Sequence, residues 1–205
     1  MIDKICMFLT NKMKKEMPDI DDERAEVINY GLQIILGEIP KIFIMLGIAY
    51  LLGVFKLSLI TFLIILPYRT FSGGFHLKTH LGCIICTSLM YTGPAFLAKY
   101  VNLDGVIKII TIMLLWIFAM IMITLYAPAD TENVPILRKS ERTQKRVLSY
   151  ITLTIALIAA ALIDNQIISN IIIIGYLFQT CSITRLAYKI TRNKYGHEVY
   201  ETSNI

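Results

Sequence analysis

The chain has 205 residues, of which 56% are hydrophobic and only 17% are charged. Soluble domains carry about a quarter of charged residues, so this composition excludes an ordinary soluble protein and indicates a single integral membrane domain. The formal net charge is +5, but the basic residues cluster in short segments between apolar runs. That pattern indicates membrane topology rather than a surface that binds nucleic acid.

Residues 1–17 predict an amphipathic helix, since apolar side chains recur at helical spacing among lysines. The apolar start is too short for a cleavable signal peptide. Pro18 ends this helix, and the acidic cluster at 19–23 favours the start of a second short helix, because carboxylates suit the positive end of a helix dipole. We therefore expect residues 1–30 to form amphipathic helices on the cytoplasmic face of the membrane.

Long apolar stretches follow, and a membrane-spanning helix needs roughly 20 such residues. We predict six spans, at residues 32–55, 57–71, 81–99, 106–127, 147–163 and 167–188. The first two are expected as a tight hairpin, because one long span there would move the cations of residues 138–146 to the outer side. The predicted fold is all-α and polytopic, with a bundle over 32–188 and a cytoplasmic tail over 189–205.

The distribution of positive charge supports this topology. With the N-terminus inside, sixteen Lys and Arg residues fall on inner segments and three on outer turns. Cytoplasmic loops of membrane proteins carry such an excess of Lys and Arg. Both termini are therefore expected in the cytoplasm.

The most polar and glycine-rich connection between two spans lies within residues 67–87, which hold two of the three histidines and two of the four cysteines. Polar and ionisable groups at a membrane boundary are costly to place, so their concentration indicates function. A cysteine nucleophile reacts as its thiolate, and a nearby imidazole can take the thiol proton. We therefore consider His76 and Cys83 as a catalytic pair.

The spacing of this pair requires a bent backbone. On a straight helix the Cα atoms of His76 and Cys83 would lie ~10.5 Å apart, too far for the side chains to meet. The flexibility for a bend comes from Gly73, Gly74 and Gly82. Thr79 is a candidate cap for a helix that begins near His80, and the dipole at that helix start would favour the thiolate of Cys83.

These residues resemble a known family. The pattern Arg69-xxx-Gly73-Gly74-x-His76-xxxxxx-Cys83 is similar to the signature of the accessory gene regulator B (AgrB) proteins. The segment 127–136, bracketed by prolines, resembles the loop that follows the family's fourth span. The resemblance covers essentially the whole chain and agrees at two separate places.

The resemblance implies a cysteine endopeptidase of the bacterial cell membrane that acts in quorum sensing. Such an enzyme removes the C-terminal tail of an amphipathic precursor peptide, through an acyl-enzyme thioester that a cysteine of the precursor then converts into a thiolactone ring. Cys83 would be the nucleophile and His76 the base, at the cytoplasmic face. Arg69 is expected to orient the peptide or steady negative charge, with Gly73 and Gly74 in support.

The expected partners are this precursor peptide and the lipid bilayer, with no nucleic acid and no cofactor. A homodimer is plausible, but the sequence shows no interface for it. The group that orients His76 stays open among Ser72, Thr79 and backbone carbonyls. The basic residues 138–146 serve either as a topology anchor or to attract an acidic substrate.

Two other functions compete with the peptidase. A metal site could use His76, His80, Cys83 and Cys86, but on one straight helix the outer two are too far apart to share a zinc ion. A transporter or channel would typically carry its polar groups in broken helices at the middle of the membrane. Here the polar cluster lies at a boundary. His197, in the polar tail, is expected to be solvated.

Overall fold

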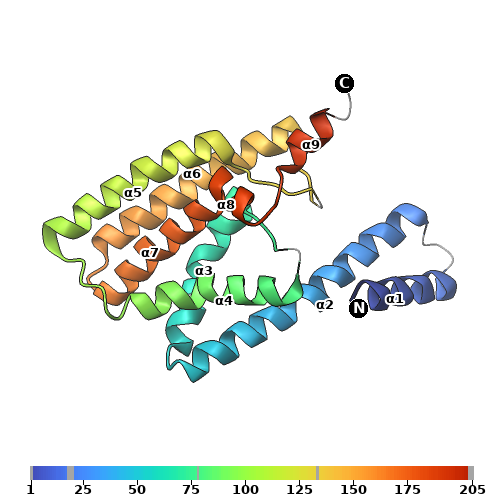
Figure 1. The fold of residues 1–205 in the computed structure, drawn as a ribbon, viewed down its shortest axis with the longest axis horizontal. Coiled ribbons are helices and arrows are strands. Elements are labelled where there is room, and N and C mark those ends of the chain that lie inside the picture. Colours follow the sequence, from blue (N-terminus) through green and yellow to red (C-terminus); the bar gives the residue numbers. More distant parts are fainter. Residues whose placement is uncertain (1, 18–20, 78, 133, 203–205) are drawn as a thin grey trace. The chain divides into compact units, whose positions relative to one another are not determined.

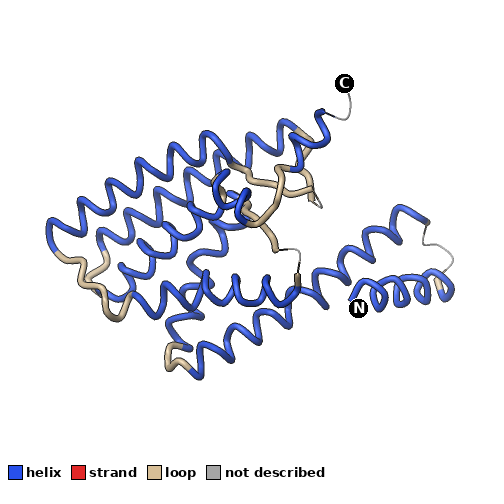
Figure 2. The backbone as a smooth tube through the Cα atoms, viewed as in Figure 1, coloured by secondary structure: helices blue, strands red, loops and turns tan. Residues whose placement is uncertain are grey.

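The computed structural model of the chain describes residues 2–17, 21–77, 79–132 and 134–202. Within these residues every regular element is an α-helix, as Figure 2 shows. The helices are α1 (Ile2–Glu16), α2 (Asp22–Leu51), α3 (Phe55–Ser72), α4 (His80–Leu97), α5 (Gly105–Tyr126), α6 (Lys139–Leu162), α7 (Gln166–Ser182), α8 (Arg185–Ile190) and α9 (Gly196–Thr202). The all-α fold class is thus confirmed. The chain divides into two compact units, Met1–Gly47 and Ile48–Ile205.

The first unit contains α1 and most of α2. The predicted amphipathic helix is present as α1, and Asp21 caps α2 by accepting a hydrogen bond from the Arg24 N–H (2.8 Å). The expectation of a separate short helix here is wrong, because α2 runs without interruption to Leu51. The change from polar to apolar sequence near residue 32 alters what the helix contacts but not its backbone hydrogen bonds, so it does not end the helix.

The predicted break between the first two apolar stretches is present. The helix α2 ends at Leu51, Gly53 takes a positive φ of 67°, and α3 begins at Phe55. A residue without Cβ is favoured in this left-handed conformation. Residues 32–71 are therefore divided between two helices and do not form one long helix.

The second unit is a bundle built around α7. Contacts join α7 to α3, α4, α5 and α6, and α5, α6 and α7 lie side by side in Figure 1. Every residue from Ser169 to Tyr176 is buried, as expected of a helix that is apolar around its whole circumference. Gly175 allows the close approach of α3, since a Cβ there would lie 2.5 Å from Cδ1 of Ile65.

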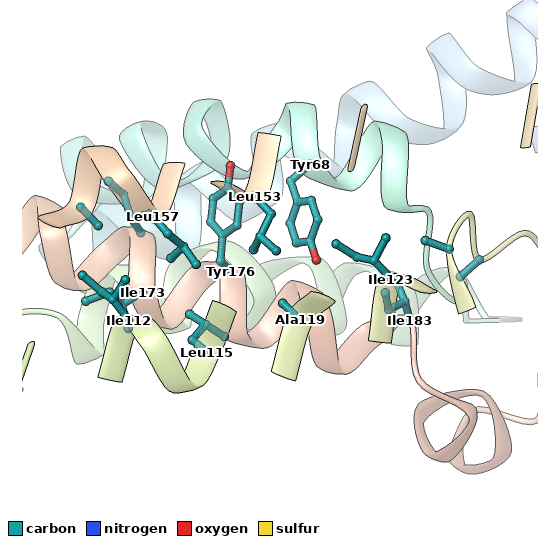
Figure 3. Close-up of a cluster of buried hydrophobic side chains, with 14 of the residues drawn as sticks. Tyr68, Ile112, Leu115, Ala119, Ile123, Leu153, Leu157, Ile173, Tyr176 and Ile183 are labelled. Carbon is teal, nitrogen blue, oxygen red and sulfur yellow. The ribbon is translucent and has the colours of Figure 1, made fainter. Parts of the chain in front are cut away.

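The core of the bundle consists of aliphatic side chains and four tyrosines, of which Figure 3 labels Tyr68 and Tyr176. The rings of Tyr68 and Tyr176 stack with their centroids 4.8 Å apart. By contrast, the outer faces of α5 and α6 expose large apolar side chains, including Val106, Leu114 and Leu162. Soluble monomers rarely expose such extensive apolar surface, so these faces suit lipid.

Three helices in the described residues, α3, α5 and α6, are long and apolar enough to cross a membrane. Two shorter apolar helices, Leu81–Leu97 and α7, accompany them in the bundle. The chain therefore has the character of a membrane protein. Six spans and cytoplasmic termini stay predictions.

The connections of the bundle fall at two opposite ends. At one end α3, α5 and α7 finish, and α4 and α6 begin (Figure 1). We call this the loop end, and it includes residues 73–77, 127–132, 134–138 and 183–195. The predicted site residues all lie there.

Candidate active site

His76 lies in a loop, whereas Cys83 lies in a helix. The residues from Gly73 to Leu77, here called the glycine loop, are not helical, whereas Cys83 lies in the first turn of α4. Thr79 caps this helix, its hydroxyl accepting a hydrogen bond from the Gly82 N–H (3.2 Å). The predicted bend between the two residues and the predicted cap at Thr79 are therefore confirmed.

The two proposed reactive side chains differ in exposure. Cys83 keeps 9% of its surface exposed, whereas His76 is exposed. One turn further along α4 lies Cys86, which is partly buried. Helices α3 and α4 pack against one another.

The two segments that carry the family resemblance meet at the loop end. Gly73 and Ala129 form an isolated parallel β-bridge. The N–H of Gly74 donates to the carbonyl of Ala129 (2.8 Å), and the N–H of Ala129 donates to the carbonyl of Ser72 (2.8 Å). The proline-bracketed loop therefore holds the glycine loop through its main chain.

Both glycines are required by this close packing. Gly73 has a φ of 73°, and a Cβ on it would lie 2.3 Å from the carbonyl oxygen of Ala129. Gly74 has a φ of 143°, and its Cβ would lie 2.5 Å from Nη1 of Arg69. A side chain at either position would meet both steric overlap and backbone strain.

Arg69 lies at the end of α3 and ties the glycine loop to α7. Its Nη2 donates to the carbonyl of Phe75 (2.9 Å), and its Nη1 donates to Oε1 of Gln179 (3.2 Å) and Oγ of Ser182 (3.1 Å). The planar fork of a guanidinium suits such divergent acceptors better than an ammonium group does. The carbonyl of Phe75 belongs to the peptide bond that enters His76.

Gln179 is a buried residue that the sequence reasoning missed. Its Nε2 donates to Oγ of Ser72 (2.9 Å) and to the carbonyl of Gly73 (2.8 Å), while its Oε1 accepts from Arg69. A signal for it was present in the sequence: Gln179 and Ser182 are polar residues inside a predicted span, and such residues are commonly functional.

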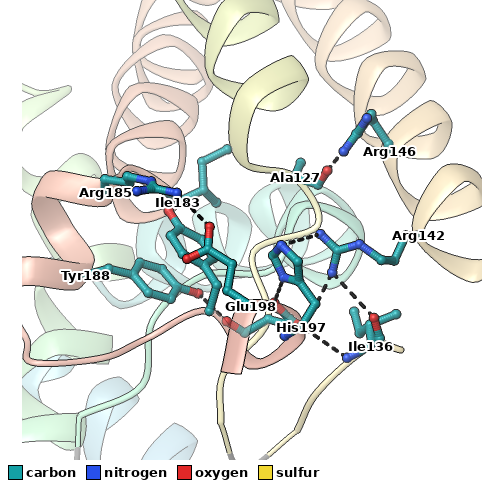
Figure 4. Close-up of polar contacts among 11 residues, drawn as sticks. Ala127, Ile136, Arg142, Arg146, Ile183, Arg185, Tyr188, His197 and Glu198 are labelled. Carbon is teal, nitrogen blue, oxygen red and sulfur yellow. Dashed lines mark hydrogen bonds and ion pairs between the residues drawn. The ribbon is translucent and has the colours of Figure 1, made fainter. Parts of the chain in front are cut away.

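A second polar cluster, which includes Arg142 and His197 in Figure 4, surrounds Asp130 of the proline-bracketed loop. Its carboxylate is fully buried and contacts Nδ1 of His197 (2.7 Å) and Nη1 of Arg142 (3.4 Å). It also accepts from the backbone N–H groups of Ile136 and His197 (2.9 Å each). The expectation of a solvated His197 is therefore wrong, because the buried carboxylate of Asp130 holds both its ring and its backbone.

The structure also bears on the metal alternative. Across the described residues, no group of three or more His, Cys, Asp or Glu side chains lies close enough together to hold an ion. The side chain of His80, which that alternative uses, lies outside the described part of the chain. None of the four cysteines forms a disulfide.

Known proteins match this chain over most of its length. The family model described as "Accessory gene regulator B" matches residues 6–183. A putative AgrB-like protein of Listeria monocytogenes serotype 4a is 34% identical over 184 residues, which cover 88% of each chain. The accessory gene regulator protein B of Staphylococcus aureus is 30% identical over 181 residues, which cover 88% of this chain and 92% of the relative. No solved structure matches the chain.

Proposed function

Since the chain belongs to the accessory gene regulator B family, we propose that it is a membrane cysteine endopeptidase of quorum sensing. In this proposal it removes the C-terminal tail of a precursor peptide and so enables closure of a thiolactone ring. Cys83 is the nucleophile and His76 is the general base. No cofactor takes part.

One observation carries the proposal: the helix break between the two residues. A thiol and an imidazole seven positions apart cannot meet on one straight helix, where ~10.5 Å of rise would separate their Cα atoms. Here His76 lies in the glycine loop, and Cys83 lies in the capped first turn of α4. The positive end of the α4 dipole is at that turn, and it favours the thiolate form of a cysteine.

The reaction follows from these roles. His76 takes the proton of the Cys83 thiol, and the thiolate attacks the carbonyl carbon at the cleavage site. The C–N bond breaks, the imidazolium returns the proton to the departing amine, and a thioester joins the precursor to Cys83. The thiol of a cysteine in the precursor then attacks this thioester. The ring closes as a thiolactone, and Cys83 is released as a thiol.

A site at the edge of the membrane suits this sequence of steps. Exchange of one thioester for another conserves the acyl energy, whereas hydrolysis would discard it. Restricted access of water protects such a reactive intermediate. The low exposure of Cys83 is consistent with that restriction.

Arg69 and the two glycines support the reaction through the glycine loop. The contacts of the guanidinium with Phe75, Gln179 and Ser182 favour a positioning role over direct contact with the peptide. The glycines permit the bridge to Ala129 that holds this loop. In this reading Arg69 acts through His76.

The proposal puts the site at the cytoplasmic face of the cell membrane. Helices that meet at the loop end carry Arg69, Arg138, Lys139, Arg142, Lys145, Arg146, Arg185 and Lys189 at or near that end. The opposite end carries Lys56, Lys99 and Lys108. An excess of cations marks the cytoplasmic side of a membrane protein.

The proposal is tested with the full chain in liposomes and a panel of amphipathic peptides, each with an internal cysteine and a C-terminal tail. Cleavage and ring closure are followed by mass spectrometry. We expect Cys83→Ala and His76→Ala to abolish cleavage. An acyl adduct of the precursor should be found on Cys83 in the native protein, and as an ester in Cys83→Ser.

Cys86→Ala is the matched control, since Cys86 lies three residues further along the same helix. This variant should cleave at the native rate. Cleavage at the native rate by Cys83→Ala would refute the nucleophile assignment, and native cleavage by His76→Ala would refute the base.

A further inference from the structure

The residues after α7 lie beyond the part of the chain that the family model matches, which ends at residue 183. The sequence predicts a cytoplasmic tail over residues 189–205. The side chain of Asn193 reaches the glycine loop, where its Nδ2 donates a hydrogen bond to the carbonyl of His76 (2.8 Å). This contact joins positions that are 117 residues apart in the sequence.

The amide of Asn193 is itself held in one orientation. Its Nδ2 also donates to Oγ1 of Thr191 (2.9 Å), so the two short hydrogen bonds use both of its N–H groups. Its backbone N–H donates to the carbonyl of Tyr188 (2.9 Å), and Arg192 before it takes a φ of 55°. This left-handed residue after α8 turns the chain so that Asn193 faces the loop.

The segment around Asn193 is anchored to the bundle on both sides. The hydroxyl of Tyr188 donates to the carbonyl of Asp130 (3.0 Å), and that of Tyr195 donates to the carbonyl of Ile183 (2.8 Å). The two rings stack with centroids 4.1 Å apart, and both residues are buried. Burial raises the pKa of the Tyr195 phenol.

His76 is consequently held from two directions. Arg69 binds the carbonyl of Phe75, in the peptide plane that enters His76, and Asn193 binds the carbonyl of His76, in the plane that leaves it. Peptide bonds are planar, so holding both planes restricts φ and ψ at His76. The direction of its Cα–Cβ bond is then set, and only the rotamer of the ring remains to be chosen.

We propose that Asn193, in the segment that follows α7, is a positioning residue for the general base. This inference rests on the proposed function of His76. Asn193 does not touch the substrate. It fixes the main chain of His76, so that the imidazole reaches the thiol of Cys83.

The test uses Asn193→Asp, which keeps the shape of the side chain but replaces the amide donor by an acceptor that repels the His76 carbonyl. Small misplacement of a catalytic group costs up to ~100-fold in rate. With a peptide that the native protein cleaves, we expect kcat to fall between about 10-fold and 100-fold, while KM changes less than about twofold. Lys194→Ala removes the adjacent exposed side chain and should leave both constants unchanged.

A second readout needs no peptide. The rate of alkylation of Cys83 by iodoacetamide is measured against pH in a Cys86→Ala background, because it reports the thiolate. With His76 present, alkylation of Cys83 should remain fast at lower pH than in His76→Ala. Asn193→Asp should shift the profile toward that of His76→Ala, and Lys194→Ala should not. Thermal unfolding in detergent checks that each variant is folded.

The outcomes separate the two proposals. If His76→Ala keeps native cleavage and a native alkylation profile, the proposed function itself fails. If His76→Ala loses both but Asn193→Asp behaves as the native protein, only the role of Asn193 is overturned. Should Asn193→Asp not fold, Thr191→Val replaces it, since it removes the hydroxyl that orients the amide. A native kcat and a native profile in Thr191→Val would then overturn the inference.

Discussion

Substitution of Gly73 by alanine separates steric overlap from backbone strain, because the chain offers two matched glycines. A Cβ on Gly73 would lie 2.3 Å from the backbone oxygen of Ala129, at a φ of 73°. Gly53 has a similar φ of 67° with nothing within 4 Å of its Cβ position. Gly93 lies inside α4, and its Cβ would meet only Phe178, at an ordinary 3.6 Å.

The three variants should therefore differ in their free energy of unfolding. Gly93→Ala should stabilise the protein by up to about 1 kcal/mol, since alanine is favoured over glycine within a helix. Gly53→Ala carries the left-handed strain of about 1–2 kcal/mol, partly offset by the lower entropy of the unfolded chain. Gly73→Ala carries the same strain and also breaks the two hydrogen bonds of the Ala129 bridge, at about 1 kcal/mol each, so its total cost is about 3–4 kcal/mol.

Titration with SDS in mixed micelles measures these free energies, and peptide cleavage is assayed in parallel. We expect Gly73→Ala to lose cleavage, because the glycine loop carries His76, while Gly53→Ala and Gly93→Ala retain it. If Gly73→Ala proves no less stable than Gly53→Ala, the close contact with Ala129 does not exist, and the account of the glycine loop is refuted.

Three further predictions concern the loop end. Arg69→Lys should lower kcat at least 10-fold, since one ammonium cannot reproduce the guanidinium's divergent hydrogen bonds; native cleavage kinetics would contradict this. Asp130→Asn should weaken the interaction of residue 130 with His197 by about 2–3 kcal/mol. Trypsin should then cleave the C-terminal segment faster than in the native protein. Unchanged cleavage would contradict the interaction of the buried carboxylate with His197. Lys194→Cys should react with a membrane-impermeant maleimide only in inside-out vesicles. Lys108→Cys should react only in right-side-out vesicles. The opposite pattern would show that the proposed topology is reversed.

Local signals in the sequence predicted the elements well. The break before α3 and the cap at Thr79 both depend on residues within a few positions of the helix end, such as Gly53 and the hydroxyl of Thr79 itself. The continuous α2 was missed for a related reason. A change in polarity does not interrupt the backbone hydrogen bonds of a helix, and α2 continues past it and past Pro40 to Leu51.

The contacts that hold the candidate site could not be predicted in the same way. Gln179, Asn193 and Ala129 bond to the glycine loop from more than 50 positions away in the chain. Which buried polar group meets which carbonyl is decided by helix packing, and spacing in one sequence does not record it. The polarity of Gln179 within an apolar helix showed only that a partner was required.

The buried carboxylate of Asp130 makes the C-terminus of this protein difficult to shorten. A truncation at the limit of the family match would remove His197, and the carboxylate would lose two contacts, with the imidazole and with the backbone N–H of that residue. Leaving a buried acceptor without its hydrogen-bond donors costs about 1–3 kcal/mol, a noticeable part of the stability of a domain. Affinity tags for purification are therefore better fused at the N-terminus, or after a spacer beyond α9, than in place of the last helix.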